Sequence, residues 1–584
     1  MSGFRSRAPA RWLPAPAVPP EVARSLEAAS RAKADLASRA AAPSAFFRLL
    51  AARGVRDVEE AERFFRTALD RLEPPEAMAD LPRAAERLAA AVRHGERILV
   101  HGDYDVDGIC STALMTRVLR AQGGDVVPFI PDRLRDGYDL GAAGVEAARA
   151  SGARVVLTCD CGTTAVAPAA ALAAMGVDLI ISDHHRPGAA LPVAFAVVNP
   201  QCESREGRDR HLAAVGVAWK LALAVTRALG GDEKIVLAEL PLVALATVAD
   251  VAPLTGDNRI LVTEGLRRMG EAPSAGLRAL IRASRTDEKR LTAGRLGYTL
   301  APRLNALGRL GSALRGVELL LADDAATANA IARECEELNE RRQVMDRKIL
   351  DEARRAVEAL DLDATYGIVL HSPAWHAGVI GIVASRVVEL TNRPTMLIAV
   401  NDGVGKGSGR SIPKFDLHAA LGGCADLLTK HGGHRAAAGL TIDVAQIPAF
   451  GERFNRIASE RLTPDDLVPE LRTDLELPID EADEAFERAL RHLEPFGVGN
   501  PGPVLVSRGV SLAGGARRVG PEGLKVRLVT AGGTLEAVGW SLAPRAAELA
   551  GERRFDIAYK LEMNEYQGKR TLQATLLDVR PTDA

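Results

Sequence analysis

Short runs of β-branched residues alternate with alanine-rich stretches from residue 97 onward. The runs are RILV, DVVPFI, ARVVLT, VDLII and FAVV, each separated from the next by a helical stretch or a short loop. Strands that alternate with helices in this way predict a parallel, doubly wound α/β sheet. A second unit of this kind begins near residue 366, where YGIVL and TMLIAV flank the helical stretch GVIGIVASRVVELT. The chain therefore predicts two α/β units in succession.

The segments around these two units have different patterns. Residues 322–360 contain neither glycine nor proline and predict one charged helix of about 60 Å at 1.5 Å per residue. After about residue 465, alternating apolar and polar residues predict a small antiparallel barrel. We expect a disordered tail over 1–20, a helical region over 21–92, a first α/β domain over 93–320, a connecting helix over 321–361, a second α/β domain over 362–460 and a barrel over 465–584.

Composition excludes several classes of protein. The 584 residues include 74 Lys and Arg against 76 Asp and Glu, so anion binding must come from local patches rather than a global positive field. The six cysteines form no CxxC pair, which is typical of reduced thiols in the cytosol and argues against structural zinc. The chain contains no uncharged apolar run of about 18 residues, and its first 20 residues lack the apolar core of a signal peptide. We expect a cytoplasmic protein without a membrane segment.

Acidic residues and histidines follow the predicted strands of the first unit, where the ligands of open parallel sheets bind. They are His101, Asp103, Asp105 and Asp107 after RILV, Asp160 after VVLT, and Asp183, His184 and His185 after VDLII. Asp250 lies in the otherwise apolar LVALATVADVAPL, where an unpaired carboxylate is costly. Any one of these short motifs is weak, because acidic turns are common. Together they predict a carboxylate and imidazole site for two Mn²⁺ or Mg²⁺ ions, a donor set suited to phosphoester hydrolysis.

The segments DYDVDG, DCG, DHH and ATVADVAPL, in this order, resemble the four motifs of the DHH phosphoesterase superfamily. The surrounding sequence is similar to RecJ-type single-strand-specific exonucleases over roughly residues 45–580. The resemblance implies that the two α/β units are a DHH catalytic domain and a DHHA1 substrate-binding domain, and that the barrel is an OB-fold. It implies catalytic roles for Asp105, Asp107, Asp160, His184 and Asp250, and metal ligation by these five together with His101 and Asp103. Which acid of HGDYDVDG binds which metal stays open at this stage.

Three segments rich in small residues hold basic side chains, a setting that suits phosphate binding although many such segments are simple turns. They are YTLAPRLNALGRLGS (298–312), GKGSGRSIPKFDL (405–417) and KHGGHRAAAG (430–439). The last two resemble the DHHA1 domain, whose arginines and Ser-x-Arg pair hold a terminal 5′ phosphate. We expect substrate-binding roles for His185, Arg303, Asn305, Arg309, Arg386, Ser408, Arg410, His434 and Arg435.

The predicted barrel carries a local excess of positive charge. Residues 504–570 hold 11 Lys and Arg against 7 acids, and HLEPFGVGNPGPVL resembles the entry to the OB-fold of RecJ-type proteins. We expect most aromatic rings of this region to fill the barrel interior. Single-strand binding is predicted for Arg517, Arg518, Lys525, Tyr566 and Lys569.

The residues predict a metal-dependent enzyme that cleaves phosphodiester bonds by two-metal-ion hydrolysis, and the resemblance implies that it is an exonuclease acting on single-stranded DNA. The resemblance also implies 5′→3′ polarity, release of 5′-mononucleotides and a role in recombination and repair. It further implies a monomer whose partners are a single-strand-binding protein and a RecQ-like helicase. Two alternatives remain. A small-substrate DHH phosphoesterase acting on dinucleotides or adenosine bisphosphate would not need the barrel. A non-catalytic replication scaffold would have lost metal ligands, whereas every acidic and histidine position of the four motifs is filled here.

Overall fold

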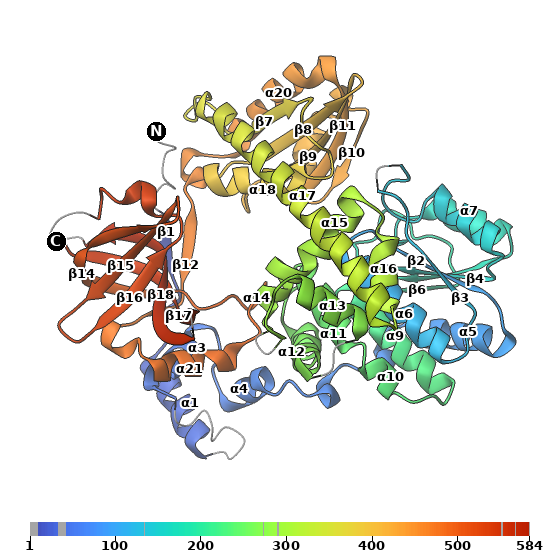
Figure 1. Cartoon of the computed structure of the whole chain (residues 1–584), viewed down its shortest axis with the longest axis horizontal. Helices are drawn as coiled ribbons and strands as arrows, with labels where there is room; N and C mark the ends of the chain where they lie inside the picture. Colours follow the sequence, from blue (N-terminus) through green and yellow to red (C-terminus); the bar gives the residue numbers. More distant parts are fainter. Residues whose placement is uncertain are drawn as a thin grey trace. The chain divides into compact units, whose positions relative to one another are not determined.

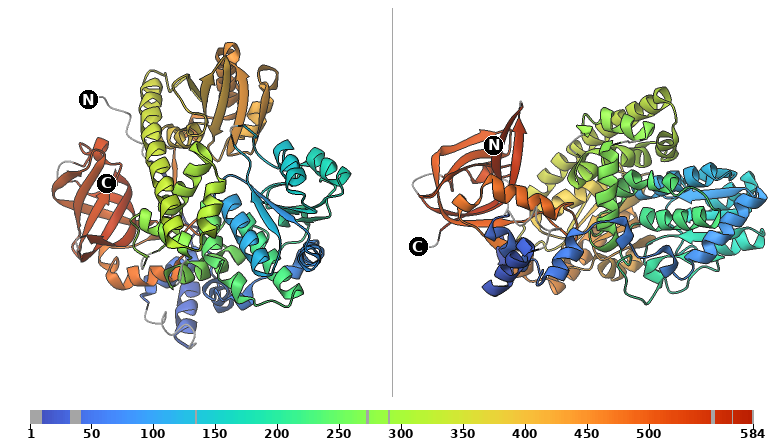
Figure 2. Two further views of the ribbon diagram at one scale, coloured as in Figure 1. Left: turned by 45° about the vertical axis from the view of Figure 1, so that its right-hand side comes forward. Right: turned by 90° about the horizontal axis from the view of Figure 1, so that it is seen from below.

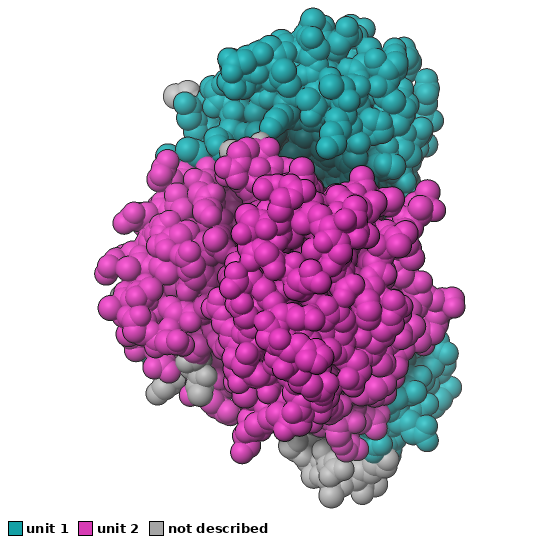
Figure 3. Space-filling model, turned by 90° about the vertical axis from the view of Figure 1, so that its right-hand side faces the viewer, with its two compact units in different colours: residues 1–65, 343–493, 502–584 teal, residues 66–342, 494–501 magenta. Residues whose placement is uncertain are grey.

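The structure is a computed structural model, and its chain folds into two compact units (Figure 3). It describes residues 10–32, 42–133, 135–271, 274–288, 291–549, 553–566 and 568–582. Unit 1 comprises residues 1–65, 343–493 and 502–584, and unit 2 comprises residues 66–342 and 494–501. In these described ranges, no helix has both the length and the apolar character that crossing a bilayer requires.

Unit 2 is built on a five-stranded parallel sheet in the order β3-β2-β4-β5-β6 (Figure 1). Its strands are β2 Ile98–Gly102, β3 Val126–Phe129, β4 Val155–Cys159, β5 Asp178–Ser182 and β6 Ala196–Val198. The predicted doubly wound α/β class is confirmed. The strand order reverses between β2 and β4, and the carboxyl edge at such a reversal is where ligands bind in open sheets.

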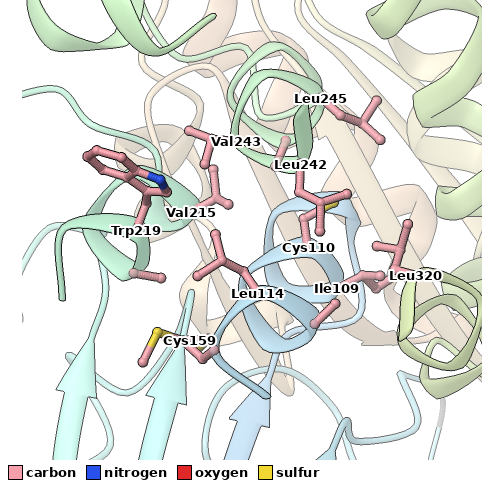
Figure 4. Close-up of a cluster of buried hydrophobic side chains, with 14 of the residues drawn as sticks. Ile109, Cys110, Leu114, Cys159, Val215, Trp219, Leu242, Val243, Leu245 and Leu320 are labelled. Carbon is pink, nitrogen blue, oxygen red and sulfur yellow. The ribbon is translucent and has the colours of Figure 1, made fainter. Parts of the chain in front are cut away.

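Helices surround the sheet and extend unit 2 beyond it. They are α5 Leu81–His94, α6 Val106–Ala121, α7 Ala142–Ser151, α8 Val166–Ala174, α9 Ala214–Ala228, α10 Lys234–Leu237, α11 Leu240–Ala249, α12 Gly256–Glu271, α13 Ala275–Ala283, α14 Ala293–Arg295, α15 Ala301–Leu310 and α16 Leu314–Leu321, with a π-helical turn at Leu296–Leu300. The core lies where α6, α9 and α11 meet (Figure 4). There Leu114, Trp219 and Leu242 contribute one side chain from each helix. Because α11 is apolar on every side, it is buried almost completely.

The long charged segment forms a single helix, α17 Ala325–Glu358. Its 34 residues correspond to about 51 Å, close to the length predicted. Asp324 caps its first turn, since the carboxylate accepts a hydrogen bond of 2.8 Å from the backbone amide of Thr327.

The second α/β region lies in unit 1 and contains a mixed rather than a doubly wound parallel sheet. Its elements are β7 Ile368–Ser372, α18 Ile380–Thr391, β8 Thr395–Asn401, β9 Val404–Arg410, α19 Leu417–Gly422, β10 Lys430–Gly433, β11 Ala437–Asp443 and α20 Ile447–Arg461. β7 and β8 pair in parallel, as predicted, but β8, β9, β11 and β10 pair antiparallel. The cause is a two-residue turn at Asp402 and Gly403, both with positive φ, which returns the chain as a hairpin.

The glycines of GKGSGR lie in strand β9 and not in the loop that we expected. A Cβ at Gly407 would lie 2.7 Å from Leu440, and a Cβ at Gly409 would lie 2.0 Å from Met396. The absence of side chains at these glycines therefore allows β9 to pack against the core. Because side chains alternate along a strand, Ser408 and Arg410 lie on the opposite face of β9.

A barrel forms the end of unit 1 (Figure 2). Its elements are β12 Glu470–Thr473, β13 Leu475–Glu476, α21 Glu484–Leu490, β14 Leu505–Val519, β15 Gly523–Val529, β16 Thr534–Gly539, β17 Phe555–Tyr566 and β18 Lys569–Pro581. The sheet closes because β14 pairs with both β15 and β17. It is not wholly antiparallel as expected, since β16 and β18 pair in parallel. Phe555 and Tyr559 fill the interior, as predicted for most of the rings.

The N-terminal segment is more ordered than the tail expected over 1–20. Residues 1–9 lie outside the described residues, but β1 Arg11–Pro14 pairs in parallel with β12, and the indole of Trp12 donates a 2.8 Å hydrogen bond to Asp578. Helices α1 Pro20–Ala32, α3 Ser44–Ala52 and α4 Val58–Phe65 follow. The expectation of a disordered tail is therefore wrong for residues 11–14. The Pro-rich composition did not indicate a strand, because this strand pairs only with the distant β12.

Candidate active site

The acids of HGDYDVDG occupy the connection from β2 to α6. Asp105 is the N-cap of α6, and its Oδ1 accepts hydrogen bonds from the amides of Asp107 (2.9 Å) and Gly108 (3.2 Å). Asp103 is buried, and its Oδ1 has no hydrogen-bond partner among the described residues. Gly108 is required here because a Cβ would lie 2.3 Å from the Asp103 carbonyl oxygen. The acids are thus crowded onto one tight turn at the reversal of the sheet.

Asp107 is held by a second helix. Its two carboxylate oxygens accept hydrogen bonds from the amides of Ala214 (2.8 Å) and Val215 (2.9 Å), the first residues of α9. The positive end of the α9 dipole favours a negative charge there. Burial and the neighbouring Asp105 carboxylate nevertheless raise the pKa of Asp107 to about 7.

Asp160 directly follows β4 and lies in the left-handed backbone region with φ of 67°. Its Oδ1 is buried without a hydrogen-bond partner in the described part of the chain. The turn after it is fixed by Asp139, which accepts hydrogen bonds from the Gly162 amide (2.6 Å) and the Thr164 hydroxyl (2.7 Å). Our sequence reasoning missed Asp139, because it lies in a loop away from every strand end and no local pattern marks it.

The histidines of DHH follow β5 and have different surroundings. The His184 ring lies between two carboxylates, with Nε2 3.2 Å from Asp160 Oδ1 and Nδ1 3.7 Å from Asp250 Oδ2. Burial and the charge of His185 lower the pKa of His184 to about 4, so its ring is neutral and able to bind a metal. Burial opposes the charge of His185 as well, but its hydrogen bond to Asp183 raises the pKa of His185 to about 9.

Three groups of these side chains bring ligand atoms within 4.8 Å of one another. They are Asp103, Asp105 and Asp160; Asp107, His184 and Asp250; and Asp160, His184 and His185. The structure thus brings together every residue expected to be catalytic. His185, expected to contact substrate, joins the third group. His101 is not in these groups, since it lies within β2 and its ring packs against Gly144 of α7, where a Cβ would lie 2.7 Å from Nε2.

The electrostatics of this cluster favour cations. Burial, followed by repulsion from the neighbouring carboxylates, raises the pKa of Asp103, Asp160 and Asp250 well above the usual range. Such a concentration of buried acids is unfavourable without positive charge between them. Carboxylate oxygens with one or two imidazoles, several of them lacking protein partners, fit Mn²⁺ or Mg²⁺.

The basic residues expected on 298–312 lie on α15 in unit 2. α15 packs directly on the acidic turn, because a Cβ at Gly308 would lie 2.1 Å from the Tyr104 carbonyl oxygen. Arg303 is already engaged, since its Nη2 donates a 3.0 Å hydrogen bond to Glu336 and its Nη1 donates to the Thr299 carbonyl. A phosphate at Arg303 would compete with Glu336. The roles of Arg303, Asn305 and Arg309 stay predictions.

The basic residues expected in the second α/β region gather in unit 1. A Cβ at Gly381, in the first turn of α18, would lie 2.8 Å from Ser408 Oγ and 3.4 Å from Arg410 Nη2. Both side chains therefore reach the positive end of that helix, an arrangement that favours anions. Arg386 pairs with Asp346 at 3.1 Å. His434 and Arg435 lie in the turn between β10 and β11, and Arg435 donates a hydrogen bond to the Pro413 carbonyl.

The barrel residues expected to bind single strands are exposed, except that the side chain of Tyr566 lies outside the described residues. Arg517, Arg518 and Lys569 are exposed, and Lys525 pairs with Glu536 at 3.2 Å. Trp540, which has 61 % of its surface exposed, does not fill the interior. Their roles in binding stay predictions.

Comparisons with known proteins agree with this architecture. The DHH family N-terminal domain matches residues 97–247, the DHHA1 domain matches residues 364–460, and the RecJ OB domain matches residues 473–578. The single-stranded-DNA-specific exonuclease RecJ of Salmonella typhimurium is 38 % identical over 560 residues, covering 92 % of this chain and 96 % of that protein.

Solved structures extend the similarity to three dimensions. Thermus thermophilus RecJ in complex with Mn²⁺ aligns with a TM-score of 0.83 and 34 % identity, covering 98 % of this chain and 80 % of that one. The same protein in complex with Mg²⁺ aligns with a TM-score of 0.77 and 32 % identity, covering 98 % of this chain and 79 % of that one. The acidic cluster described above is therefore set in a fold whose solved examples hold these two cations.

Proposed function

The chain belongs to the RecJ family, and from this premise we propose that it is a single-stranded-DNA-specific exonuclease that degrades its substrate from the 5′ end to 5′-mononucleotides. The observation that carries the proposal is the convergence of three metal-ligand groups at the carboxyl edge of the parallel sheet. The relatives supply the substrate class, because each is named for activity on single-stranded DNA.

Two divalent cations would be held by Asp103, Asp105, Asp107, Asp160, His184 and Asp250. When bound, such ions activate water and stabilise the oxygen that leaves phosphorus in phosphodiester hydrolysis. His101 is a weaker candidate than its sequence position indicated, because its ring faces Gly144. Mn²⁺ and Mg²⁺ both suit this donor set, and both are present in solved relatives.

The surrounding residues hold these ligands in place before substrate arrives. The α9 amides orient Asp107, and Asp105 is fixed by its role as the N-cap of α6. His185 keeps a proton at neutral pH through Asp183, so it would donate a hydrogen bond to a phosphate oxygen. Preorganised donors of this kind stabilise charge that develops during the reaction.

The 5′→3′ polarity would come from recognition of the terminal phosphate. Ser408 and Arg410 at the start of α18 form the strongest such site on geometry, because a hydroxyl, a guanidinium and a helix N-terminus converge there. Arg303, Asn305, Arg309, Arg386, His434 and Arg435 are proposed as further contacts to the substrate. The exposed basic residues of the barrel would bind other nucleotides of the same strand.

We also propose that the enzyme acts in DNA recombination and repair in the cytoplasm, as a monomer, with a single-strand-binding protein and a RecQ-like helicase as partners. The barrel, matched as a RecJ OB domain, favours a polymeric substrate over the small substrates of other DHH enzymes. The complete metal-ligand groups count against a non-catalytic scaffold.

A digestion of single strands labelled at either end tests the proposal. With Mn²⁺ present, a 5′-labelled 40-mer should release labelled mononucleotide at once, whereas a 3′-labelled strand should shorten gradually. Asp160→Asn should abolish both while leaving single-strand binding intact. Asn keeps the left-handed backbone accessible, and Asp402→Asn, at an exposed left-handed position of unit 1, is the matched control. Immediate release from the 3′ label would contradict the proposed polarity.

A further inference from the structure

The turn that follows helix α11 contains a valine, Val251, at the position where such turns usually place glycine. The amide of Val251 donates to the Val248 carbonyl and the amide of Ala252 donates to the Thr247 carbonyl, both at 3.2 Å. This pair of bonds is the Schellman motif, and Val251 occupies its left-handed position with φ of 62°. Glycine adopts that conformation without strain, whereas a β-branched residue there is a true outlier.

Packing of the Val251 side chain does not offset this backbone strain. The side chain of Val251 is 62 % exposed, so its methyl groups face water rather than a core. The backbone that follows Val251 is instead held in place, since Ala252 and Leu254 are buried and the Leu254 amide donates a 2.7 Å hydrogen bond to the Val498 carbonyl. Segment 494–501 therefore keeps the turn in place, as expected where surrounding structure over-determines a strained residue.

The position of Val251 connects the strain to the active site. Val251 directly follows Asp250, whose Oδ2 lies 3.7 Å from His184 Nδ1. A single exposed valine is ordinary on a protein surface, but one that is held in a strained conformation next to Asp250 offers an apolar surface close to charged groups. The sugar and base of a nucleotide are the apolar parts of the proposed substrate.

We propose that Val251 is a substrate-contacting residue, which packs against the sugar or base of the nucleotide beside the scissile phosphate. The inference rests on the proposed function and deepens it, since it assigns an apolar contact to a site otherwise built of charges. The inference makes two separate predictions for position 251. Glycine would relieve the strain of the backbone, whereas the substrate requires the valine side chain.

A second helix of unit 2 provides a matched control. α13 ends in the same pair of bonds, from Arg285 to the Arg282 carbonyl and from Thr286 to the Ile281 carbonyl, and Arg285 has φ of 55°. Arg285 is exposed as well. Relief of backbone strain alone is therefore measurable at a position outside the acidic groups.

The experiment compares Val251→Gly, Val251→Asn, Val251→Ala and Arg285→Gly in the full chain. Melting temperature, the Mn²⁺-induced shift of that temperature, and kcat and KM on a single-stranded 40-mer are measured. We expect both glycine variants to melt at higher temperature, and all four to keep the Mn²⁺ shift. Loss of the methyl groups should lower kcat/KM by about tenfold in Val251→Gly and Val251→Asn, less in Val251→Ala, and not in Arg285→Gly.

Wild-type kcat/KM in Val251→Gly would overturn the inference. A loss of activity accompanied by loss of the Mn²⁺ shift would also overturn it, because Val251 would then act through Asp250 and not on substrate. A wild-type chain that does not degrade the 40-mer would instead contradict the proposed function itself, so the two failures are distinguishable.

Discussion

The Nδ1 atom of His185 lies 2.8 Å from Oδ1 of Asp183. The same oxygen accepts hydrogen bonds from the backbone amides of His184 and His185, so one buried carboxylate orients the whole DHH turn. Burial alone would raise the pKa of Asp183, but the hydrogen bond from His185 keeps it below the usual range. Asp183 is therefore a positioning residue, and its charge sets the protonation of its neighbour.

Asp183→Asn should release the proton that His185 holds at neutral pH. Without the Asp183 carboxylate, burial is offset only by the charges of Asp250 and Asp103, so the pKa of His185 should fall from about 9 toward its ordinary value of 6.5. Histidine NMR titration of the metal-free protein measures this directly. Tyr138→Phe, which removes the hydroxyl that lies 3.2 Å from His185 Nε2, is the control and should leave the pKa near 9. A pKa near 9 in Asp183→Asn would contradict this account.

Asp160→Asn should make the metal-free protein more stable at neutral pH. The folded-state pKa of Asp160 is raised, so ionisation costs stability as the pH rises from the ordinary value of 3.8 through the raised value. Asn removes that cost, and the melting temperature of the variant at about pH 8 should exceed that of the wild type. The stabilisation by Mn²⁺ should disappear at the same time. Asp402→Asn should change neither quantity, and a lower melting temperature for Asp160→Asn would refute the prediction.

Binding of Mn²⁺ should release protons and strengthen as the pH rises. Asp107 has a pKa of about 7 in the metal-free protein, and the metal binds the ionised form. Affinity should therefore increase from about pH 6 to about pH 8. Calorimetry at pH 7 in buffers of different ionisation enthalpy counts the protons released. An observed heat that does not depend on the buffer would show that these carboxylates are already ionised.

Asp139→Ala should weaken metal binding although Asp139 is in none of the ligand groups. It fixes the turn after Asp160 through Gly162 and Thr164, and loss of such an orienting residue costs about 10- to 100-fold in metal affinity. The Mn²⁺ concentration at half-maximal thermal shift measures the effect. Asp287→Ala, at an exposed position elsewhere in unit 2, is the control. Unchanged affinity would limit Asp139 to a structural role.

Arg410→Ala should impair strands that carry a 5′ phosphate more than strands that end in a hydroxyl. Loss of a charge-assisted hydrogen bond should raise KM for the phosphorylated strand by at least about tenfold. Ser408→Ala should act in the same direction but more weakly, since the serine hydroxyl carries no charge of its own and the Arg410 guanidinium remains. Arg453→Ala, which removes a partly exposed arginine of α20 that pairs with Asp426, should affect both strands equally little. An equal increase of KM for the two strands would argue against recognition of the 5′ phosphate.

The sequence was sufficient to predict the parallel sheet and the residues gathered at its edge. Both depend on local pattern, because a buried strand is recognisable by its apolar run and the residue after it must lie at the carboxyl edge. His101 lies within β2, where its ring packs against Gly144 of α7, so its part in metal binding stays a prediction.

Other parts of the site depend on contacts between distant segments. The amides of Ala214 and Val215 reach Asp107 across more than 100 positions, and any helix start offers the same groups. Glu336 engages Arg303 from another helix, which no spacing indicates. The glycines of β9 resembled a phosphate-binding loop in the sequence. They are needed because the side chains of Leu440 and Met396 leave no room for a Cβ, and these side chains lie in other strands.

Segment 494–501 gives the chain an interlaced topology. It is part of unit 2, although the residues on both sides of it, up to 493 and from 502, belong to unit 1. A fragment that stops after residue 461 would uncover Leu254 and remove the support behind the turn that follows Asp250. The barrel is thus not an interchangeable module: its elements lie on both sides of segment 494–501, so a barrel exchanged between homologues must bring a loop that matches unit 2.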